Sequence, residues 1–360
     1  MKYRETEIFD RSDVGASGTK SIDINVVDPI SRLDITWHQY EYGEMIAQPA
    51  AVMPKIELTD GSDVLFSMSG LEAQALNIYD RSVRTMNSPT TNNGNWQMIT
   101  ASIDFGRWLW DRQLAFDPKQ FNNPQLKITF DEDACHSGAL FNYLEVFAHC
   151  FDELAISPIG FLMSKVHYAY TPADDNSYHY IDLPTDYVYR QMLIRGWKNK
   201  KDPLDVVDEA RLSEENDKRV VFDLNLVRYF YRMMGVWEPV IEQWNEYAKV
   251  TDEANNKFFT PTNWMTIAEA QTQGAFNDFQ TVTAMYGGWM DWRGSVGNMF
   301  YGNVMGYLPN HTLSLPFGVQ SEIDSWYEAQ TKKSIRLRLL SSTQYAESLV
   351  SVILQQLRTY

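Results

Sequence analysis

Short runs of alternating apolar and polar residues, rich in β-branched and aromatic side chains, dominate the first half of the chain. Asp-Gly, Asn-Gly and proline positions separate these runs. Because alternate side chains of a strand point to opposite faces of a sheet, this pattern predicts strands rather than helices. The predicted strands are residues 31–42, 52–59, 64–68, 97–105, 125–131 and 140–151.

One segment of this half has a helical period instead. In residues 70–84, Leu71, Ala75 and Ile78 recur three or four positions apart. This spacing places apolar side chains on one face of a helix, which can pack against a sheet. Residues 1–21 alternate in charge and are predicted to form a polar arm.

The strand pattern resumes after Pro158 and Gly160, which mark a predicted domain boundary. Residues 1–157 would form the arm and the first domain, and residues 158–360 the second. The strands predicted in the second domain are residues 165–170, 178–183, 187–195, 220–230, 312–319, 334–340 and 349–357.

The connections of the second domain are predicted from turn residues and charge. The turn at residues 172–177 predicts a hairpin between the strands on either side of it. Residues 198–218 are charged and are predicted to form a solvated excursion. Pro239 lies in the first turn of a helix predicted over residues 238–250.

Residues 255–310 mix Asn, Gly, Met, Trp and Tyr with weak periodicity, which predicts a long insertion that spans about 233–310 in all. Within it, residues 285–307 interleave glycines with large aromatic side chains and are predicted to be a loop covered by another part of the protein or by another subunit. A sugar-stacking platform and a membrane-touching loop are the alternatives. The candidate subunit-interface residues are Trp289, Trp292, Phe300 and Tyr301.

The two halves of the chain end alike. Residues 126–151 and residues 335–360 each contain a short strand, a polar turn and a longer apolar segment. The longer segments also fit a helical spacing, but we interpret them as strands, because the neighbouring strands need partners. The sequence therefore predicts an all-β fold of two β-sandwiches in tandem, with a few short helices and a long insertion in the second.

Composition and charge narrow the classes of function. A hydrophobic content of 44% and an aromatic content of 14% exclude a disordered chain. The net charge of −16 would repel a phosphate backbone, so a dedicated nucleic-acid binder is not expected. No apolar run reaches the roughly 18–20 residues of a membrane span, and residues 1–20 do not resemble a secretory signal. We expect a chain that is made and kept, or assembled, inside a cell.

The two cysteines have histidine neighbours, as Cys135-His136 and His149-Cys150. This spacing suggests a zinc site, yet adjacent residues of a strand point to opposite faces and could not reach one ion together. We interpret Cys135 and Cys150 as small core side chains with reduced thiols. No metal site is predicted.

Other chemical motifs are equally sparse. The acidic turns at residues 131–133 and 174–175 lack the spaced ligands of a calcium loop and are interpreted as solvated. Phosphate-binding loops, serine nucleophile elbows and metalloprotease motifs do not occur, so neither a cofactor nor a catalytic residue is predicted. A pair of carboxylates for glycoside hydrolysis stays open, because its members meet only in the folded chain.

Residues 178–195, with the sequence YHYIDLPTDYVYRQMLIR, are similar to the paired strands that open a second jelly roll. Together with the apolar closing strands of each half, they give the chain a resemblance to the double jelly-roll major capsid proteins of tailless icosahedral viruses, above all those of membrane-containing bacteriophages. The resemblance implies a homotrimer of hexagonal outline that tiles an icosahedral shell over an internal lipid membrane. It also implies assembly in the host cytoplasm, location in the virion, and contacts with minor capsid or penton proteins.

Two other classes of function are kept beside this one. The 11 tryptophans and the acidic balance also suit a carbohydrate-binding or carbohydrate-active β-sandwich. That function would require exposed stacking aromatics and two carboxyl groups about 5–10 Å apart in one cleft. A virion spike or receptor-binding protein is the third class, and its copy number per particle distinguishes it from a shell protein.

Overall fold

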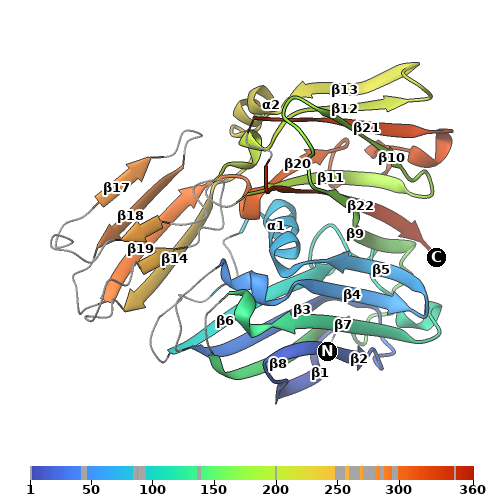
Figure 1. Cartoon of the computed structure of the whole chain (residues 1–360). Helices are drawn as coiled ribbons and strands as arrows, with labels where there is room; N and C mark the ends of the chain where they lie inside the picture. Colours follow the sequence, from blue (N-terminus) through green and yellow to red (C-terminus); the bar gives the residue numbers. More distant parts are fainter. Residues whose placement is uncertain are drawn as a thin grey trace.

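The computed structural model describes residues 2–41, 47–83, 87, 95–135, 139–198, 201–247, 256–258, 268–270, 280–283, 288–293, 299–343 and 346–360. The strands in these residues form five sheets. Figure 1 shows the larger sheets stacked as layers, with helix α1 near the centre and a smaller sheet projecting from one side.

The first eight strands build one two-sheet unit. They are β1 (Tyr3–Asp13), β2 (Ser17–Asp23), β3 (Ile30–Glu41), β4 (Lys55–Asp60), β5 (Asp63–Met68), β6 (Asn95–Asp104), β7 (Pro124–Asp131) and β8 (Ala139–Phe151). One sheet has the order β1-β8-β3-β6, and the facing strands have the order β2-β7-β4-β5. The chain thus crosses repeatedly between two antiparallel sheets, as in a jelly roll.

The second unit repeats this order strand for strand. Its strands are β9 (Gly160–Tyr170), β10 (Tyr178–Leu183), β11 (Val188–Trp197), β12 (Val207–Glu214), β13 (Arg219–Asn225), β20 (Thr312–Pro316), β21 (Ile335–Ser341) and β22 (Leu349–Thr359). The orders are β9-β22-β11-β20 and β10-β21-β12-β13. The predicted all-β fold of two jelly rolls is therefore confirmed, and so is the predicted correspondence between the two chain ends, which are the seventh and eighth strands of each unit.

An α-helix follows the fifth strand in both units. These helices are α1 (Gly70–Arg81) and α2 (Leu226–Met233). Short 3₁₀ turns occur at Pro49–Val52, Pro118–Gln120, Glu132–Ala134, Pro203–Asp205, Pro309–His311 (η5), Ile323–Ser325 and Ala329–Thr331.

The two jelly rolls join edge to edge. Strand β5 of the first pairs in parallel with β9 of the second at Phe66↔Ser164 and Ser67↔Lys165, which makes one sheet of eight strands. The Lys165 ammonium adds a hydrogen bond to the carbonyl oxygen of Val64, at 2.9 Å. The main hydrophobic core of the first jelly roll also takes in Leu193 from the second, so apolar packing continues across the junction.

Helix α1 is positioned by its caps and by the edge strand beside it. Ser69 and Glu72 form a capping box at its start, in which each side chain accepts a hydrogen bond from the other residue's backbone N–H. The Asn77 amide bonds both the backbone N–H and the carbonyl of Ser102 at 3.0 Å. The helix thereby occupies hydrogen-bonding groups that edge strand β6 would otherwise leave unpaired.

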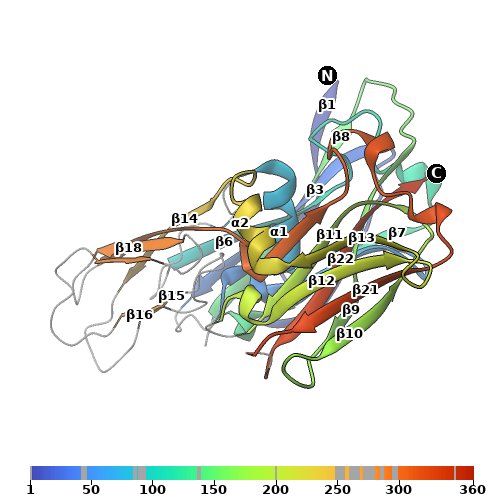
Figure 2. The same ribbon diagram turned by 90° about the horizontal axis from the view of Figure 1, so that it is seen from above.

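A separate sheet lies between α2 and β20 in the chain and projects beyond the jelly rolls (Figures 1 and 2). Its strands are β14 (Val240–Tyr247), β17 (Gln280–Thr283), β18 (Trp289–Arg293) and β19 (Met299–Gly306), in the order β14-β19-β18-β17. Strands β15 (Asn256–Phe258) and β16 (Ala268–Ala270) form a fifth, two-stranded sheet. We call the four-stranded sheet the projecting sheet.

The polar arm predicted for residues 1–21 is wrong, because those residues form β1 and most of β2. Strand β1 pairs along β8 in antiparallel register, with Glu5 opposite His149. Strands β1 and β2 are each the end strand of a sheet, so one long side of each has no neighbouring strand among the described residues. Edge positions tolerate the alternating charges that suggested an unstructured arm.

The solvated excursion predicted for residues 198–218 is also wrong. It contains β12, an inner strand between β21 and β13. Ala210 and Leu212 are fully buried, while the charged Glu209 and Arg211 alternate with them on the other face. The charged residues on the solvent face made this segment look like an exposed loop in the sequence, although its other face is buried.

Two predicted connections in the second jelly roll differ from the structure. Residues 220–230 are not one strand, since β13 ends at Asn225, whose side chain accepts the backbone N–H of Arg228 and starts α2. Strands β9 and β10 form no hairpin, because β9 pairs with β22 and β10 with β21. Likewise β10 and β11, the strands of the similar stretch 178–195, lie in facing sheets rather than side by side.

The helix predicted over residues 238–250 is strand β14, and the loop predicted over residues 285–307 contains β18 and β19. Strand β14 pairs along its whole length with β19, from Val240↔Gly306 to Tyr247↔Met299. The helical spacing of its apolar residues was overridden by a backbone partner that lies far along the chain. The intrinsic conformational preference of a segment has little influence where a partner strand is present.

Candidate functional site

The four candidate interface residues all lie on adjacent strands of the projecting sheet. Trp289 and Trp292 belong to β18, and Phe300 and Tyr301 to β19, which pairs with it in antiparallel register. Trp289 is half-buried, and its indole N–H donates a hydrogen bond to the Met305 sulfur at 3.2 Å. The side chains of the other three lie outside the described residues, so their contact with a second subunit stays a prediction.

The glycines of this segment have a structural place that the sequence did not indicate. Gly302 is the register partner of both Trp244 on β14 and Trp292 on β18. The alternation of glycine and aromatic residues is therefore the pattern of a three-stranded ladder rather than of a loop.

A second candidate surface covers the outer face of sheet β1-β8-β3-β6. Trp96 on β6 and Phe141 on β8 are 46% and 44% exposed, and their rings stack at 6.4 Å. The Arg11 guanidinium lies 5.1 Å from the Trp96 ring and 4.8 Å from the Tyr143 ring. Exposed apolar groups gathered on one face indicate an interaction surface. Sequence analysis missed this one, because alternation along a strand does not say which face is covered.

The same outer face carries carboxylates beside histidines. His149 Nε2 lies 2.7 Å from Asp34 Oδ2, and its Nδ1 lies 3.5 Å from Glu5. His38 pairs with Glu145 at 2.9 Å. Burial raises the pKa of Asp34, but hydrogen bonds from His149 and Ser102 outweigh burial, and the pKa ends below its ordinary value. Asp34 therefore stays ionised at neutral pH.

The junction between the jelly rolls holds a buried polar cluster. Asp80 at the end of α1 accepts hydrogen bonds from Arg190 at 2.5 Å and from Gln191 at 2.8 Å, both on β11. Gln355 on β22 donates to the same carboxylate at 2.9 Å and accepts from Arg190 at 2.6 Å. Every hydrogen bond of this cluster to Asp80 crosses from one jelly roll to the other.

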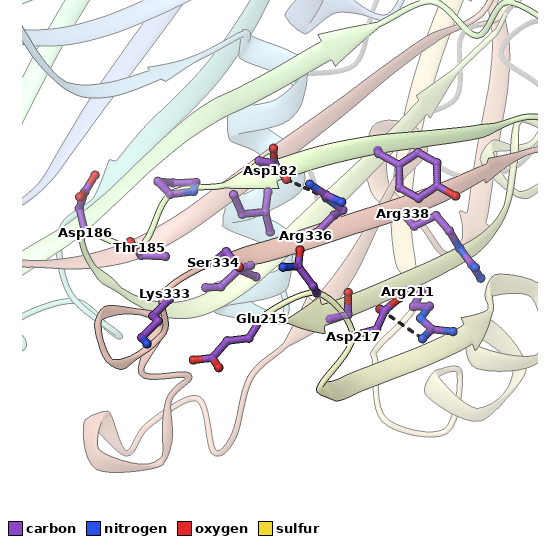
Figure 3. A pocket seen from close by; sticks show the side chains of 16 residues that line it. Asp182, Thr185, Asp186, Arg211, Glu215, Asp217, Lys333, Ser334, Arg336 and Arg338 are labelled. Atoms are coloured by element: carbon purple, nitrogen blue, oxygen red, sulfur yellow. Dashed lines mark hydrogen bonds and ion pairs between the residues drawn. The ribbon is translucent and has the colours of Figure 1, made fainter.

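The hollow of Figure 3 lies on the outer face of sheet β10-β21-β12-β13 and has a volume of about 560 Å³. Ion pairs cross it, with Arg336 Nε 2.8 Å from Asp182 and Arg211 Nη2 3.3 Å from Asp217. A hydrogen bond from Ser213 and the Arg211 charge lower the pKa of Asp217. A glycoside hydrolase needs a carboxylic acid of raised pKa, so Asp217 has the wrong protonation for a general acid.

The cysteine interpretation is confirmed. Cys135 and Cys150 are fully buried in the core of the first jelly roll, and both are free thiols. Burial raises the pKa of the Cys150 thiol to about 11. His136 lies outside the described residues, and the described part of the chain holds no group of three or more His, Cys, Asp or Glu side chains placed to bind a metal.

The acidic turns bond their own backbone. Asp131 accepts the backbone N–H of Asp133 at 3.2 Å, and Asp174 accepts that of Asp175 at 2.9 Å. Within the ranges that the structure covers, no helix has the length and apolar character needed to span a membrane.

Comparison with known proteins shows which solved structures have a similar architecture. No protein-family model and no curated protein sequence matches the chain. The atomic structure of Sulfolobus turreted icosahedral virus is similar, with a TM-score of 0.64 and 10% identity over 100% of this chain and 91% of that one. The major capsid protein P2 of bacteriophage PM2 has a TM-score of 0.58 and 11% identity over 99% and 98%. The PBCV-1 virus capsid has a TM-score of 0.57 and 10% identity over 99% and 93%.

These similarities extend over the whole chain and include both units. The chain therefore has the double jelly-roll fold of viral major capsid proteins, as the resemblance of its sequence implied.

Proposed function

We propose that this chain is the major capsid protein of an icosahedral virus and that it acts as a structural unit without a catalytic step. The observation that carries this proposal is the similarity to capsid structures, which extends over the whole chain and so includes both of its jelly rolls. The described surface fits this role, since ion pairs cross the hollow of Figure 3 and the exposed aromatic residues Trp96 and Phe141 lie on the outer face of a sheet.

We propose a homotrimer as the assembly unit. Two similar jelly rolls in one chain give three copies six similar edges, so that a threefold assembly acquires a hexagonal outline. The projecting sheet, with Trp289 and its neighbours, is proposed to contact the next subunit near the threefold axis. Burial there would cover aromatic side chains that a lone subunit leaves in water.

The further partners belong to the same proposal. Trimers would tile a shell and meet minor capsid or penton proteins where its curvature changes, after assembly in the host cytoplasm. The net charge of −16 disfavours direct contact with packaged nucleic acid. An internal lipid membrane between shell and genome fits that charge, and no sequence-specific nucleic-acid contact is proposed.

The test is to express the full chain and to examine it by light scattering and negative-stain electron microscopy. A trimeric mass with a hexagonal outline is the expected result. A monomer at micromolar concentration that also builds no particles with its partner proteins would overturn the proposal. A glycan-binding screen of the same sample tests the carbohydrate alternative, since a capsid subunit needs no such binding in order to assemble.

A further inference from the structure

A cavity lies where three parts of the chain meet. Its volume is about 240 Å³, and it shares no lining residue with the hollow of Figure 3. Helix α1 of the first jelly roll contributes Tyr79 and Asp80 to its wall, and β11 of the second contributes Arg190. Trp237, which follows α2, and Val240, the first residue of β14, complete this part of the wall. A molecule bound here would therefore contact both jelly rolls and the start of the projecting sheet.

The wall of the cavity is mainly apolar and contains three aromatic side chains, which are Tyr79, Trp237 and Tyr307. The half-buried Trp237 ring lies edge-to-face with the Tyr79 ring, with 5.3 Å between the ring centroids. Val236 also lines the cavity and is 71% exposed. Aromatic rings favour another ring placed against them, and a ligand that covers exposed apolar side chains is bound more tightly. The wall therefore suits a ring compound.

The polar groups of the wall indicate an uncharged donor on that ring. Asp80 and Arg190 neutralise each other, so the cavity needs no ionic ligand. Gln320 is different, because its Nε2 donates to the carbonyl oxygens of Arg190 at 3.1 Å and Phe317 at 3.2 Å, which fixes the orientation of the amide. The Oε1 of Gln320 is buried and has no hydrogen-bond partner among the residues that the structure describes. A buried acceptor without a donor is unfavourable, so a ligand that supplies an N–H or O–H group is favoured here.

One wall of the cavity is fixed by hydrogen bonds from both jelly rolls. Leu308, which lines the cavity, and Asn310 have φ angles of 49° and 46°, in the left-handed region that such residues seldom adopt. The Asn310 Nδ2 donates to the carbonyl oxygen of Leu71 on α1 at 2.9 Å, and the Asn310 carbonyl accepts from Arg195 Nε on β11 at 3.1 Å. Strained backbone of this kind occurs at ligand sites, and a wall that is ordered in advance reduces the entropy cost of binding.

We propose that this cavity binds a small planar ring compound with one uncharged N–H or O–H group, its ring against Trp237 and its donor on Gln320 Oε1. A cavity of about 150 Å³ holds benzene, so the larger volume here suits a single substituted ring or two fused rings. Indoles and phenols belong to this class. The bound molecule would hold the two jelly rolls and β14 in one arrangement, because the native chain binds it and the unfolded chain does not. This site goes beyond the proposed structural role and does not depend on it.

The first test compares indole with indene, which has nearly the same shape but no N–H group. Calorimetric titration of the full chain should give indole a dissociation constant on the order of 0.1 mM, in keeping with a ligand of this size. Indene should bind about tenfold more weakly, because it leaves Gln320 Oε1 without a donor. Indole should also raise the midpoint of thermal unfolding as its concentration increases. Absence of indole binding at millimolar concentration, or equal affinity for the two compounds, would overturn the proposal.

Variants then locate the binding site. Gln320→Met keeps the length of the side chain but removes the acceptor, so it should abolish the preference for indole and leave the affinity for indene unchanged. Trp237→Ala should weaken binding of both compounds at least about tenfold, because it removes the ring from the wall. Trp108→Ala is the matched control, since it removes an exposed tryptophan that does not line the cavity.

Circular dichroism verifies folding of every variant. If Gln320→Met keeps the full preference for indole, or if Trp237→Ala binds both compounds as tightly as the wild type, the compounds bind elsewhere and the proposal is overturned. Either result leaves the proposed function untouched, because light scattering of the chain without any added compound tests that function separately.

Discussion

The guanidinium of Arg190 lies 2.5 Å from the carboxylate of Asp80, and these side chains are only 4% and 3% exposed. Arg190 belongs to the second jelly roll and Asp80 to the helix of the first. A buried charge is costly unless its partner is in place, so this pair holds the two jelly rolls in one orientation. A fixed orientation of the two jelly rolls is what the shell subunit proposed above would need.

Removing one member of this pair should destabilise the protein strongly. Asp80→Ala leaves the Arg190 charge buried without its partner and should lower the free energy of unfolding by about 3–5 kcal/mol. Urea denaturation measures the loss. Asp182→Ala is the control, because the Asp182–Arg336 pair is 77% and 50% exposed and should contribute less than about 1 kcal/mol. Equal losses in the two variants would show that the junction does not depend on the buried pair.

Substitution in the projecting sheet should act on assembly more than on folding. Trp289→Ser together with Trp292→Ser removes two large side chains from β18, a strand of the projecting sheet. We expect dissociation of the proposed trimer at concentrations where the wild type stays associated, with the melting temperature of the jelly rolls nearly unchanged. Trp108→Ser removes an exposed tryptophan elsewhere and serves as the control. A trimer unaffected by the double substitution would exclude this sheet as the interface.

The free energy of unfolding should decrease as the pH is lowered, because His311 is buried in its neutral form. Burial, with a smaller effect of the Arg195 charge, lowers the pKa of His311 from 6.5 to about 3. Between these two values the unfolded chain binds a proton that the folded chain does not, so stability is full above pH 6.5 and declines below it. The slope from this one group approaches about 1.4 kcal/mol per pH unit.

Urea denaturation between pH 7 and pH 5 checks this slope. In His311→Gln the free energy of unfolding should depend less steeply on pH, because the number of protons taken up on unfolding falls by close to one. His167→Gln, at an exposed position, is the control for the loss of a histidine. Identical slopes in all three proteins would refute the assignment to His311.

The domain boundary near residues 157–160 is testable by cutting the chain. A protease site inserted between Ser157 and Pro158 should yield fragments 1–157 and 158–360 that stay folded and elute together, since β5–β9 pairing and the Asp80 cluster link them without the connecting backbone. Gel filtration after cleavage measures this. A site inserted in the β4–β5 turn at Gly61 cuts within one jelly roll and is the comparison. Unfolding after the cut at residue 157 would show that the boundary lies elsewhere.

The alternation of apolar and polar residues was sufficient to predict the strands that have one buried and one exposed face. The segment 124–131 alternates buried and half-buried residues along β7, and the helix predicted at residues 70–84 is α1, which ends at Arg81. These elements follow from the period of the side chains and from caps such as Ser69, all of which lie within a few residues of one another. The closing strands β8 and β22 also fit a helical spacing. They could be predicted as strands only by adding that the neighbouring strands need hydrogen-bond partners.

Where the sequence failed, the deciding partner was distant. Strand β14 has the apolar spacing of a helix, but its backbone pairs with β19 about sixty positions later. Strand β12 is hidden by charges on its solvent face and is recognised only between β21 and β13. Neither hydrogen-bond partner can be read from a local window.

The candidate surfaces divide in the same way. Composition alone led to Trp289, Trp292, Phe300 and Tyr301, because large aromatics among glycines are conspicuous in a sequence. The exposed aromatic face beside Trp96 became visible only in the folded chain, since the order of strands in a sheet decides which edge and which face are covered. The sequence thus determined the strands with a clear local period and the division into two jelly rolls. The tertiary structure decided the strands whose partners are distant and the surfaces through which the two jelly rolls pack, because both depend on contacts between residues far apart in the chain.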